Sequence, residues 1–317
     1  LEVFIDGFTG SHRYFYHAGL GSLYTAVIST IEVLSILTFV ATIIFFARRN
    51  LIKLPRFNMQ ELRGWPRQDA NFILLFELLL ILFIFMMNTA DEALLLESHQ
   101  GSYGFAISQY LAPAFFGSDY APQTLNILSG VGWWGHLLMV FLFLNYLPYS
   151  KHLHILFAFP NTYFSNLNPL GKWTNMETVQ REVGLMLDPS LEPNLEVGEN
   201  SDPQRFGAKD VNDLTWKQLL DAYSCTECGR CTSVCPANQT GKLLSPRKVM
   251  MDTRDRLAEL GTNGFNFDDG KPLLGGYITE EEIWACTSCN ACVQECPVNI
   301  DPLSILIDLR RYLVMEE

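Results

Sequence analysis

Three long apolar stretches dominate the first half of the chain. They cover residues 19–47, 70–90 and 125–159. A helix needs about 20 apolar residues to cross a bilayer, so each stretch is long enough for one crossing. The third exceeds one crossing, and Pro148 predicts a kink in it. We therefore expect residues 1–160 to form a bundle of transmembrane helices, with the end of the third stretch projecting from the membrane.

The second half of the chain has the pattern of a soluble domain. Residues 161–209 are rich in Asn, Pro, Glu and Gly, which predicts a polar linker. In residues 210–317, Ser245 precedes a proline and an apolar-periodic run, and Thr279 starts a capping box; both predict helix starts. No segment there has the pattern of a strand. The predicted fold class is all-α: a transmembrane helical bundle followed by an α-helical domain.

The charges of the loops predict the orientation of the helices. The basic residues between the first two stretches are Arg48, Arg49, Lys53, Arg56, Arg63 and Arg67. The acidic residues between the second and third are Asp91, Glu92, Glu97 and Asp119. Cytoplasmic loops carry the excess of Lys and Arg. We expect a multi-pass protein of the inner membrane whose second half lies on the cytoplasmic side. Residues 1–7 resemble the end of an apolar helix, so we expect the protein to continue upstream.

All eight cysteines lie in two similar groups. The first reads CTECGRCTSVCP from Cys225, and the second reads CTSCNACVQECP from Cys286. Both follow the run C-x₂-C-x₂-C-x₃-C-P of ferredoxins with two [4Fe–4S] clusters, in which the fourth cysteine ligates the other cluster. One predicted cluster takes Cys225, Cys228, Cys231 and Cys296, and the other takes Cys286, Cys289, Cys292 and Cys235.

Two alternatives are zinc in place of iron–sulfur clusters and nucleic acid as a partner. A pair of structural zinc sites also uses C-x₂-C pairs, but it leaves the third cysteine and the C-x₃-C-P tail of each group unexplained. The formal net charge of −12 argues against nucleic acid as a partner. Two iron–sulfur clusters are therefore the favoured interpretation.

The two motifs and the helical insert between them resemble the ferredoxin module of the heterodisulfide reductase C subunit. Related modules occur in the iron–sulfur subunits of glycerol-3-phosphate and succinate dehydrogenases. The resemblance covers residues 210–314 and includes all eight cysteines. It implies a conductor of electrons between a soluble redox centre and the membrane.

Two histidines on the third stretch suggest a haem. His136 and His154 are 18 positions apart, which is about five turns of one continuous helix and about 27 Å along it. Both then face the same side, whereas His152 faces away. A histidine inside a membrane span is costly and is a functional candidate. The alternative is that His136 forms a hydrogen bond inside the bundle and His154 lies at the membrane interface.

This stretch resembles the last helix of the nitrate reductase gamma subunit family and of the cytochromes that pair with heterodisulfide-reductase-like proteins. In that family two histidines on the second helix and two on the fifth bind two b haems. The resemblance implies one or two b haems here, with the visible stretches as helices three to five. The partner ligands then lie upstream of Leu1 or are His12 or His17, for which a surface role is the alternative.

The combined prediction is a membrane electron-transfer subunit. It passes electrons between lipid-soluble quinone, haem b, two clusters and a soluble partner, either a CCG-domain iron–sulfur protein or a flavoprotein. The chain shows no CCG pair, so we expect that chemistry on another subunit and leave its own enzymatic role open. Glu32 and Glu77 either line a quinone or proton path or are neutralised in the bundle. The rival functions are a haem-free anchor for a ferredoxin module and a redox sensor.

Overall fold

The structure, a computed structural model, is built from helices. It describes residues 2–52, 54–99, 101–116, 121–188, 206–267 and 269–316. Within these ranges there is no strand, only an isolated bridge between Leu274 and Ile278. The chain divides into two compact units, Leu1–Ser150 and Lys151–Glu317, and each is described by itself. The predicted all-α class is confirmed.

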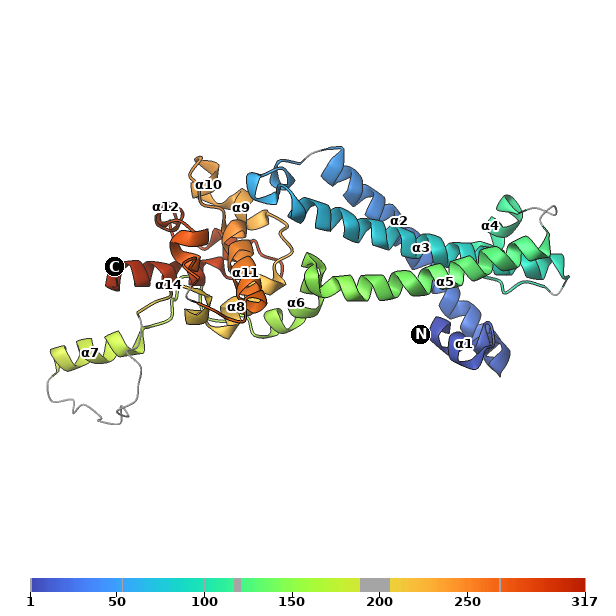
Figure 1. Cartoon of the computed structure of the whole chain (residues 1–317), viewed down its shortest axis with the longest axis horizontal. Helices are drawn as coiled ribbons and strands as arrows, with labels where there is room; N and C mark the ends of the chain where they lie inside the picture. The colour runs from blue at the N-terminus through green and yellow to red at the C-terminus, as the bar shows by residue number, and fades with distance from the viewer. Residues whose placement is uncertain are drawn as a thin grey trace. The chain divides into compact units, whose positions relative to one another are not determined.

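The first unit holds the long apolar helices (Figure 1). Its helices are α1 (Glu2–Thr9), α2 (Gly21–Asn50), α3 (Trp65–Glu97), α4 (Ser108–Phe115) and α5 (Pro122–Tyr146). Three segments are long and apolar enough to cross a membrane, namely Tyr16–Asn50, Trp65–Glu97 and Pro122–Tyr149. Large apolar side chains on them face outward, as Leu37 does with 61% of its surface exposed. Such an outer surface suits lipid rather than water, and the three predicted spans are confirmed as helices.

Two glycines of α5 allow α3 to pack closely against it. A Cβ atom on Gly132 would lie 2.7 Å from the backbone nitrogen of Met87, and one on Gly135 would lie 2.5 Å from the ring of Phe83. Small residues let membrane helices approach each other in this way. The run GVGWWG at residues 130–135 has the glycine spacing of a dinucleotide-binding loop. It lies inside α5, where Gly132 and Gly135 serve helix packing.

The second unit is a set of shorter helices. They are α6 (His154–Tyr163), α7 (Glu177–Leu187), α8 (Trp216–Ser224), α9 (Arg230–Val234), α10 (Pro236–Gln239), α11 (Pro246–Thr262), α12 (Glu280–Trp284), α13 (Ala291–Gln294) and α14 (Pro302–Met315). The hydroxyl of Ser245 accepts a hydrogen bond from the N–H of Lys248, and Thr279 and Glu282 form the expected capping box. Both predicted helix starts are confirmed.

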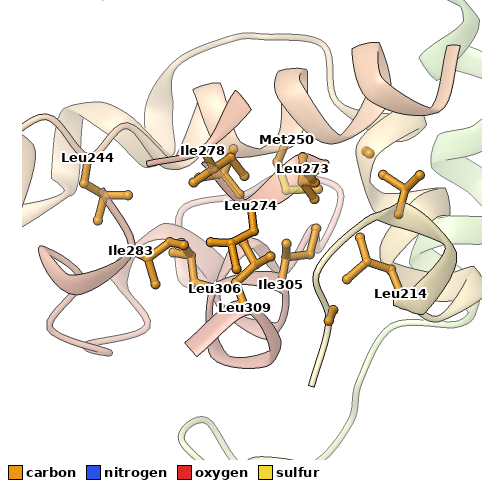
Figure 2. Packing of buried hydrophobic residues seen from close by; sticks show 14 of the residues in the cluster. Leu214, Leu244, Met250, Leu273, Leu274, Ile278, Ile283, Ile305, Leu306 and Leu309 are labelled. Atoms are coloured by element: carbon orange, nitrogen blue, oxygen red, sulfur yellow. The ribbon is translucent and has the colours of Figure 1, made fainter. Parts of the chain in front are cut away.

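The core of the second unit gathers around α14. Figure 2 shows Leu273, Leu274 and Ile278 beside Leu306 and Leu309, which lie on that helix. All five are at most 5% exposed. Burying each such side chain contributes about 1.5–3 kcal/mol. Residues of this core lie before and after each of the two cysteine loops in the sequence, so the core anchors both ends of each loop.

The end of the third apolar stretch differs from the prediction. The helix α5 stops at Tyr146, a 3₁₀ turn covers Leu147–Tyr149, and Ser150 is extended before a second turn leads into α6. The continuous helix that placed His136 and His154 on one face is therefore wrong. The expected linker, residues 161–209, contains α7, and its residues 189–205 lie outside the described ranges.

We expect Gly132→Ala to weaken the first unit. The new methyl group would meet the backbone of Met87, which has little freedom to move, so α3 and α5 would be forced apart. Overpacking of this kind costs about 1–3 kcal/mol. Thermal unfolding of the purified protein in detergent measures the effect.

Gly130→Ala is the matched control, because a Cβ atom there has no heavy atom within 4 Å. Alanine also favours a helix over glycine, so this variant should be as stable as the parent or slightly more stable. Equal losses in both variants would contradict the close helix contact.

Candidate metal centre

The two cysteine loops have the same backbone conformation. In the first loop Glu227 and Gly229 have left-handed φ angles of 59° and 76°, and at the matching positions of the second loop Ser288 and Asn290 have 54° and 61°. In each loop the N–H two residues after the first cysteine donates to that cysteine's sulfur, over 3.4 Å in both cases. Each loop then enters a short helix, α9 or α13. The sequence repeat therefore produces a repeated site, with N–H groups directed at sulfur as in iron–sulfur proteins.

Thiols from both groups line one cavity. Its cysteines are Cys225, Cys228, Cys231, Cys292 and Cys296. Four of them form the set predicted for the first cluster. Within the described ranges, no three potential ligands converge on a point that would suit a single metal ion. Sulfur donors that are spread around a cavity instead fit an iron–sulfur cluster, whose iron atoms are bound at separate corners.

The second predicted set combines the cysteines of the second loop with Cys235 of the first group. The pKa of Cys292 is raised to about 12, because the thiol is buried and because Cys286, Asp301 and Cys235 oppose its negative charge. The pKa of Cys286 is also raised, chiefly by burial, with Cys235 contributing. Cys235 thus lies near two thiols of the second group, and Cys289 is exposed. Soft thiolate donors in this number suit iron–sulfur clusters.

Buried charges hold the first loop. Glu227 is 4% exposed and forms ion pairs with Lys151 and with Arg254, the latter over 2.8 Å. Burial alone would raise the pKa of Glu227, but the two cations hold it below its usual value. The loop therefore depends on a carboxylate shared between two basic side chains.

A different arrangement holds the second loop. The guanidinium of Arg310 donates to the backbone oxygens of Ile283 (2.7 Å) and Cys286 (2.5 Å) and packs over the ring of Trp284 at 5.3 Å. These contacts fix the loop from the side of α14. The two loops thus share a backbone but differ in the charges around them.

The segment after Cys296 is anchored by α6. Asn161, which is fully buried, donates to the backbone oxygen of Val298 over 2.9 Å and accepts from Lys217 over 3.0 Å. Residues after the third apolar stretch therefore help to place the last cysteine. Sequence patterns gave no indication of this contact.

The two proposed haem ligands lie in different units but have similar surroundings. Nδ1 of His136 lies 3.3 Å from the backbone oxygen of Leu80, and Nδ1 of His154 lies 2.8 Å from that of Lys151. This contact orients each ring and leaves Nε2 as the nitrogen for a metal, as is common for metal-binding histidines. His136 also lines an apolar cavity of about 380 Å³.

The other two histidines have weaker claims as ligands. Nε2 of His12 lies 2.8 Å from the carboxylate of Asp91, which engages the ring in the fold. His17 is exposed, and its ring packs edge-on against Tyr16 at 5.6 Å. The structure does not bring either of them into the cavity that His136 lines.

A buried arginine that the sequence analysis missed lies beside that cavity. Arg13 is 1% exposed and donates to Asp91 over 2.6 Å, to Asn88 over 2.6 Å and to Tyr24 over 2.9 Å. The only hint of this pair in the sequence is that the partner, Asp91, directly follows the second apolar stretch. Such a pair has no fixed spacing, so only the fold reveals it.

Glu32 has a structural role in the first unit. Its buried carboxylate accepts hydrogen bonds from the N–H groups of Ile107 (2.8 Å) and Ser108 (3.1 Å) and from the side chain of Asn88 (3.0 Å). It therefore caps the start of α4. Glu77 lies half-buried on α3.

Comparison with known proteins supports the iron–sulfur domain. Residues 221–300 match the family described as 4Fe-4S dicluster domain. The chain is 31% identical to the probable iron-sulfur-binding oxidoreductase FadF of Bacillus subtilis, over 94% of this chain and 43% of that protein. It is 29% identical to the EtfAB:quinone oxidoreductase of Syntrophomonas wolfei, over 65% of this chain and 29% of that protein.

The resemblance to the heterodisulfide reductase C subunit is also supported. The corresponding protein of Methanosarcina mazei, from its ferredoxin:CoB-CoM heterodisulfide reductase, is 31% identical over 30% of this chain and 48% of that protein. The chain spans less than half the length of each of these three relatives. No solved structure matches the chain. The chain therefore carries a dicluster [4Fe–4S] domain and is related to iron–sulfur oxidoreductases.

We expect Glu227→Gln to weaken the first cysteine loop. The change leaves Lys151 and Arg254 without the carboxylate that they share, and breaking a buried ion pair costs about 3–5 kcal/mol. The rate at which visible cluster absorbance bleaches in the presence of an iron chelator measures the loss. One of the two clusters should bleach faster than in the parent protein.

Ser288→Ala is the matched control, because Ser288 occupies the same left-handed position in the second loop. It removes only a long hydrogen bond of 3.3 Å from Arg310, so bleaching should change little. Equal bleaching of the two variants would show that the buried ion pairs do not stabilise the site.

Proposed function

We propose that this chain is a membrane electron-transfer subunit that conducts electrons between the quinone pool and a soluble redox partner through two [4Fe–4S] clusters. The observation that carries the proposal is the repeated cysteine loop with N–H groups directed at sulfur, in a chain that also has three helices of membrane-crossing length. In this proposal the chain supplies a path for electrons, and substrate conversion takes place on another subunit.

In this proposal each cluster takes three cysteines from one group and its fourth from the other group. The first cluster takes Cys225, Cys228, Cys231 and Cys296, and the second takes Cys286, Cys289, Cys292 and Cys235. The shared cavity supports the first set, and the effect of Cys235 on the pKa of Cys286 and Cys292 supports the second. Because each group of cysteines reaches across to the other, the two clusters would lie close enough to exchange electrons.

At least one b haem completes the path in this proposal; His136 and His154 would each supply one ligand to a separate haem. A bound haem would supply a one-electron carrier between quinone and the clusters. The Nδ1 contacts of both histidines and the cavity beside His136 support ligation through Nε2. The partner ligands would come from upstream of Leu1. His12 and His17 are less suited, because Asp91 engages the ring of His12 and the ring of His17 is exposed.

The soluble partner and the orientation are parts of the same proposal. Six basic residues lie between positions 48 and 67 in the sequence, which favours a cytoplasmic position for this segment and for the cluster domain. One relative has EtfAB and quinone in its name, which supports a quinone link here. A flavoprotein is one of the two partner classes in this proposal. A CCG-domain iron–sulfur protein is the other partner class. The net charge of −12 does not suit nucleic acid.

A haem at these histidines predicts a spectroscopic result. The complete protein, including any residues upstream of Leu1, should show a b-type α band in its reduced-minus-oxidised spectrum. His136→Ala and His154→Ala should each reduce that band while both clusters remain detectable by EPR. His17→Ala is the control and should leave the band unchanged, because that ring is exposed. A complete protein without the band would favour the haem-free anchor.

Electron conduction also predicts a kinetic result. A quinol analogue should reduce both clusters of the complete protein rapidly, as followed by stopped-flow absorbance. His136→Ala should slow this reaction at least tenfold without changing reduction by dithionite, a soluble reductant that bypasses the membrane. Slow reduction of the parent protein by quinol would contradict the proposal and favour the redox sensor.

A further inference from the structure

The helix α6 packs one face against α8 and exposes the opposite face (Figure 1). On the packed face, the ring of Phe157 lies against that of Tyr223 on α8. On the opposite face, Leu156, Phe159 and Tyr163 are each at least 60% exposed. These three residues are three and four positions apart, so they form one stripe along the helix. The helix therefore presents large apolar side chains on both faces.

The exposed stripe continues onto the start of α8. The ring of Phe164 packs edge-on against Tyr163 at 4.9 Å and against Trp216 at 5.1 Å between ring centroids. Trp216 is the first residue of α8, and it is also largely exposed. We call Leu156, Phe159, Tyr163, Phe164 and Trp216 the α6 surface. A group of neighbouring exposed apolar side chains marks a site of interaction with a protein or a membrane.

Four of the five residues of the α6 surface lie in a stretch without charged side chains. From His152 to Gly171 the sequence contains no Asp, Glu, Lys or Arg, whereas 18% of the whole chain is charged. A surface helix in water normally carries charged and polar residues on its outer face. Exposed Tyr and Trp are instead typical of the membrane interface, where the ring meets lipid and the polar tip meets water. The composition therefore favours lipid headgroups over bulk water.

The chain leaves the third candidate span just before α6. That span, Pro122–Tyr149, has 28 residues. As a helix it is about 42 Å long, which is the thickness of a bilayer with its headgroups. We therefore expect Tyr149 near the membrane surface. The helix α6 begins at His154, and even a fully extended chain between these two residues reaches only about 18 Å. Covalent continuity with the span thus keeps the start of α6 near the headgroups.

We propose that the α6 surface lies in the headgroup region of the bilayer and holds the second unit on the membrane. This inference rests on the proposed membrane location of the third span. Helices that lie in the membrane plane bury their apolar face about 5–10 Å into the boundary between headgroups and acyl chains. The rival occupants of the α6 surface are a soluble redox partner and a second copy of the chain.

The test uses the tryptophan fluorescence of the complete protein, with both clusters, in lipid nanodiscs. Phosphatidylcholine with bromine near the glycerol end of its acyl chains quenches tryptophans in the headgroup region. The emission of Trp216 is the difference between the parent protein and Trp216→Phe. It should lose at least half of its intensity in brominated lipid relative to unbrominated lipid. Quenching by the clusters is the same in both lipids, so it cancels. Phenylalanine keeps a ring beside Phe164, and the variant should fold.

Trp284 provides the matched control. It is also exposed, but Glu280 and Glu281 on the same helix are exposed too, and moving their charges into lipid is costly. The emission lost in Trp284→Phe should therefore not respond to bromine. Tyr163→Trp examines α6 itself, and the emission that it adds should be quenched as strongly as that of Trp216. Equal responses of Trp216 and Trp284, or no response at positions 163 and 216, would overturn the inference.

Iodide, a soluble quencher, identifies the rival occupants. If bromine does not quench Trp216 and iodide is excluded only in nanodiscs with two copies, the surface is an interface between copies. If exclusion of iodide instead requires an added soluble flavoprotein, the surface belongs to that partner. Either result would overturn the inference.

Washing membranes with alkaline carbonate separates this inference from the proposed function. A chain that carbonate releases would overturn the membrane location and this inference with it. A chain that stays in the membrane while bromine leaves Trp216 unquenched would overturn only the role of the α6 surface. The electron path through the two clusters would then still stand.

Discussion

The close burial of several thiols is the constraint on which the second unit depends. Burial and neighbouring thiols raise the pKa of Cys225 and Cys231 to about 12, so thiolates in this space need a compensating positive charge. Bound iron supplies that charge, and N–H groups directed at sulfur add to it. Cys225 and Cys235 belong to the same buried core as Leu273 and Leu309. Cluster binding and folding of this unit are therefore coupled.

Patterns that act over a few residues were read correctly from the sequence. The spacing of the cysteines fixes where each loop must turn, so two similar runs give two loops with matching left-handed residues at Glu227 and Ser288. The cap at Thr279 needs only its neighbour Glu282, and it formed as expected. At the end of the third apolar stretch the expected kink at Pro148 is present, but the continuous helix from His136 to His154 is wrong. Half-buried Phe157 packs against Tyr223 of the second unit, at 6.1 Å between ring centroids, so this residue contributes to packing within that unit.

Single buried charges were beyond the reach of sequence patterns. The side chain of Arg13 pairs with Asp91, 78 positions away, and that of Lys151 pairs with Glu227, 76 positions away. Neither separation follows a helical or strand period, and an isolated arginine is usually a surface residue. Both ion pairs became visible only in the folded structure. The sequence could thus predict the two cysteine loops, but not the charges that surround them.

Because α5 ends at Tyr146, His154 does not lie on the helix that carries His136. A single long helix would have made it a distant partner of His136 within one bundle. The structure instead ties it to the cluster unit, because Nδ1 of His154 lies 2.8 Å from the backbone oxygen of Lys151, whose side chain pairs with Glu227 in the first cysteine loop. A haem bound at His154 would then share a bonded neighbour with the first cluster. Lys151 therefore links the ring of His154 and the carboxylate of Glu227 within one unit, the first through its backbone oxygen and the second through its side chain.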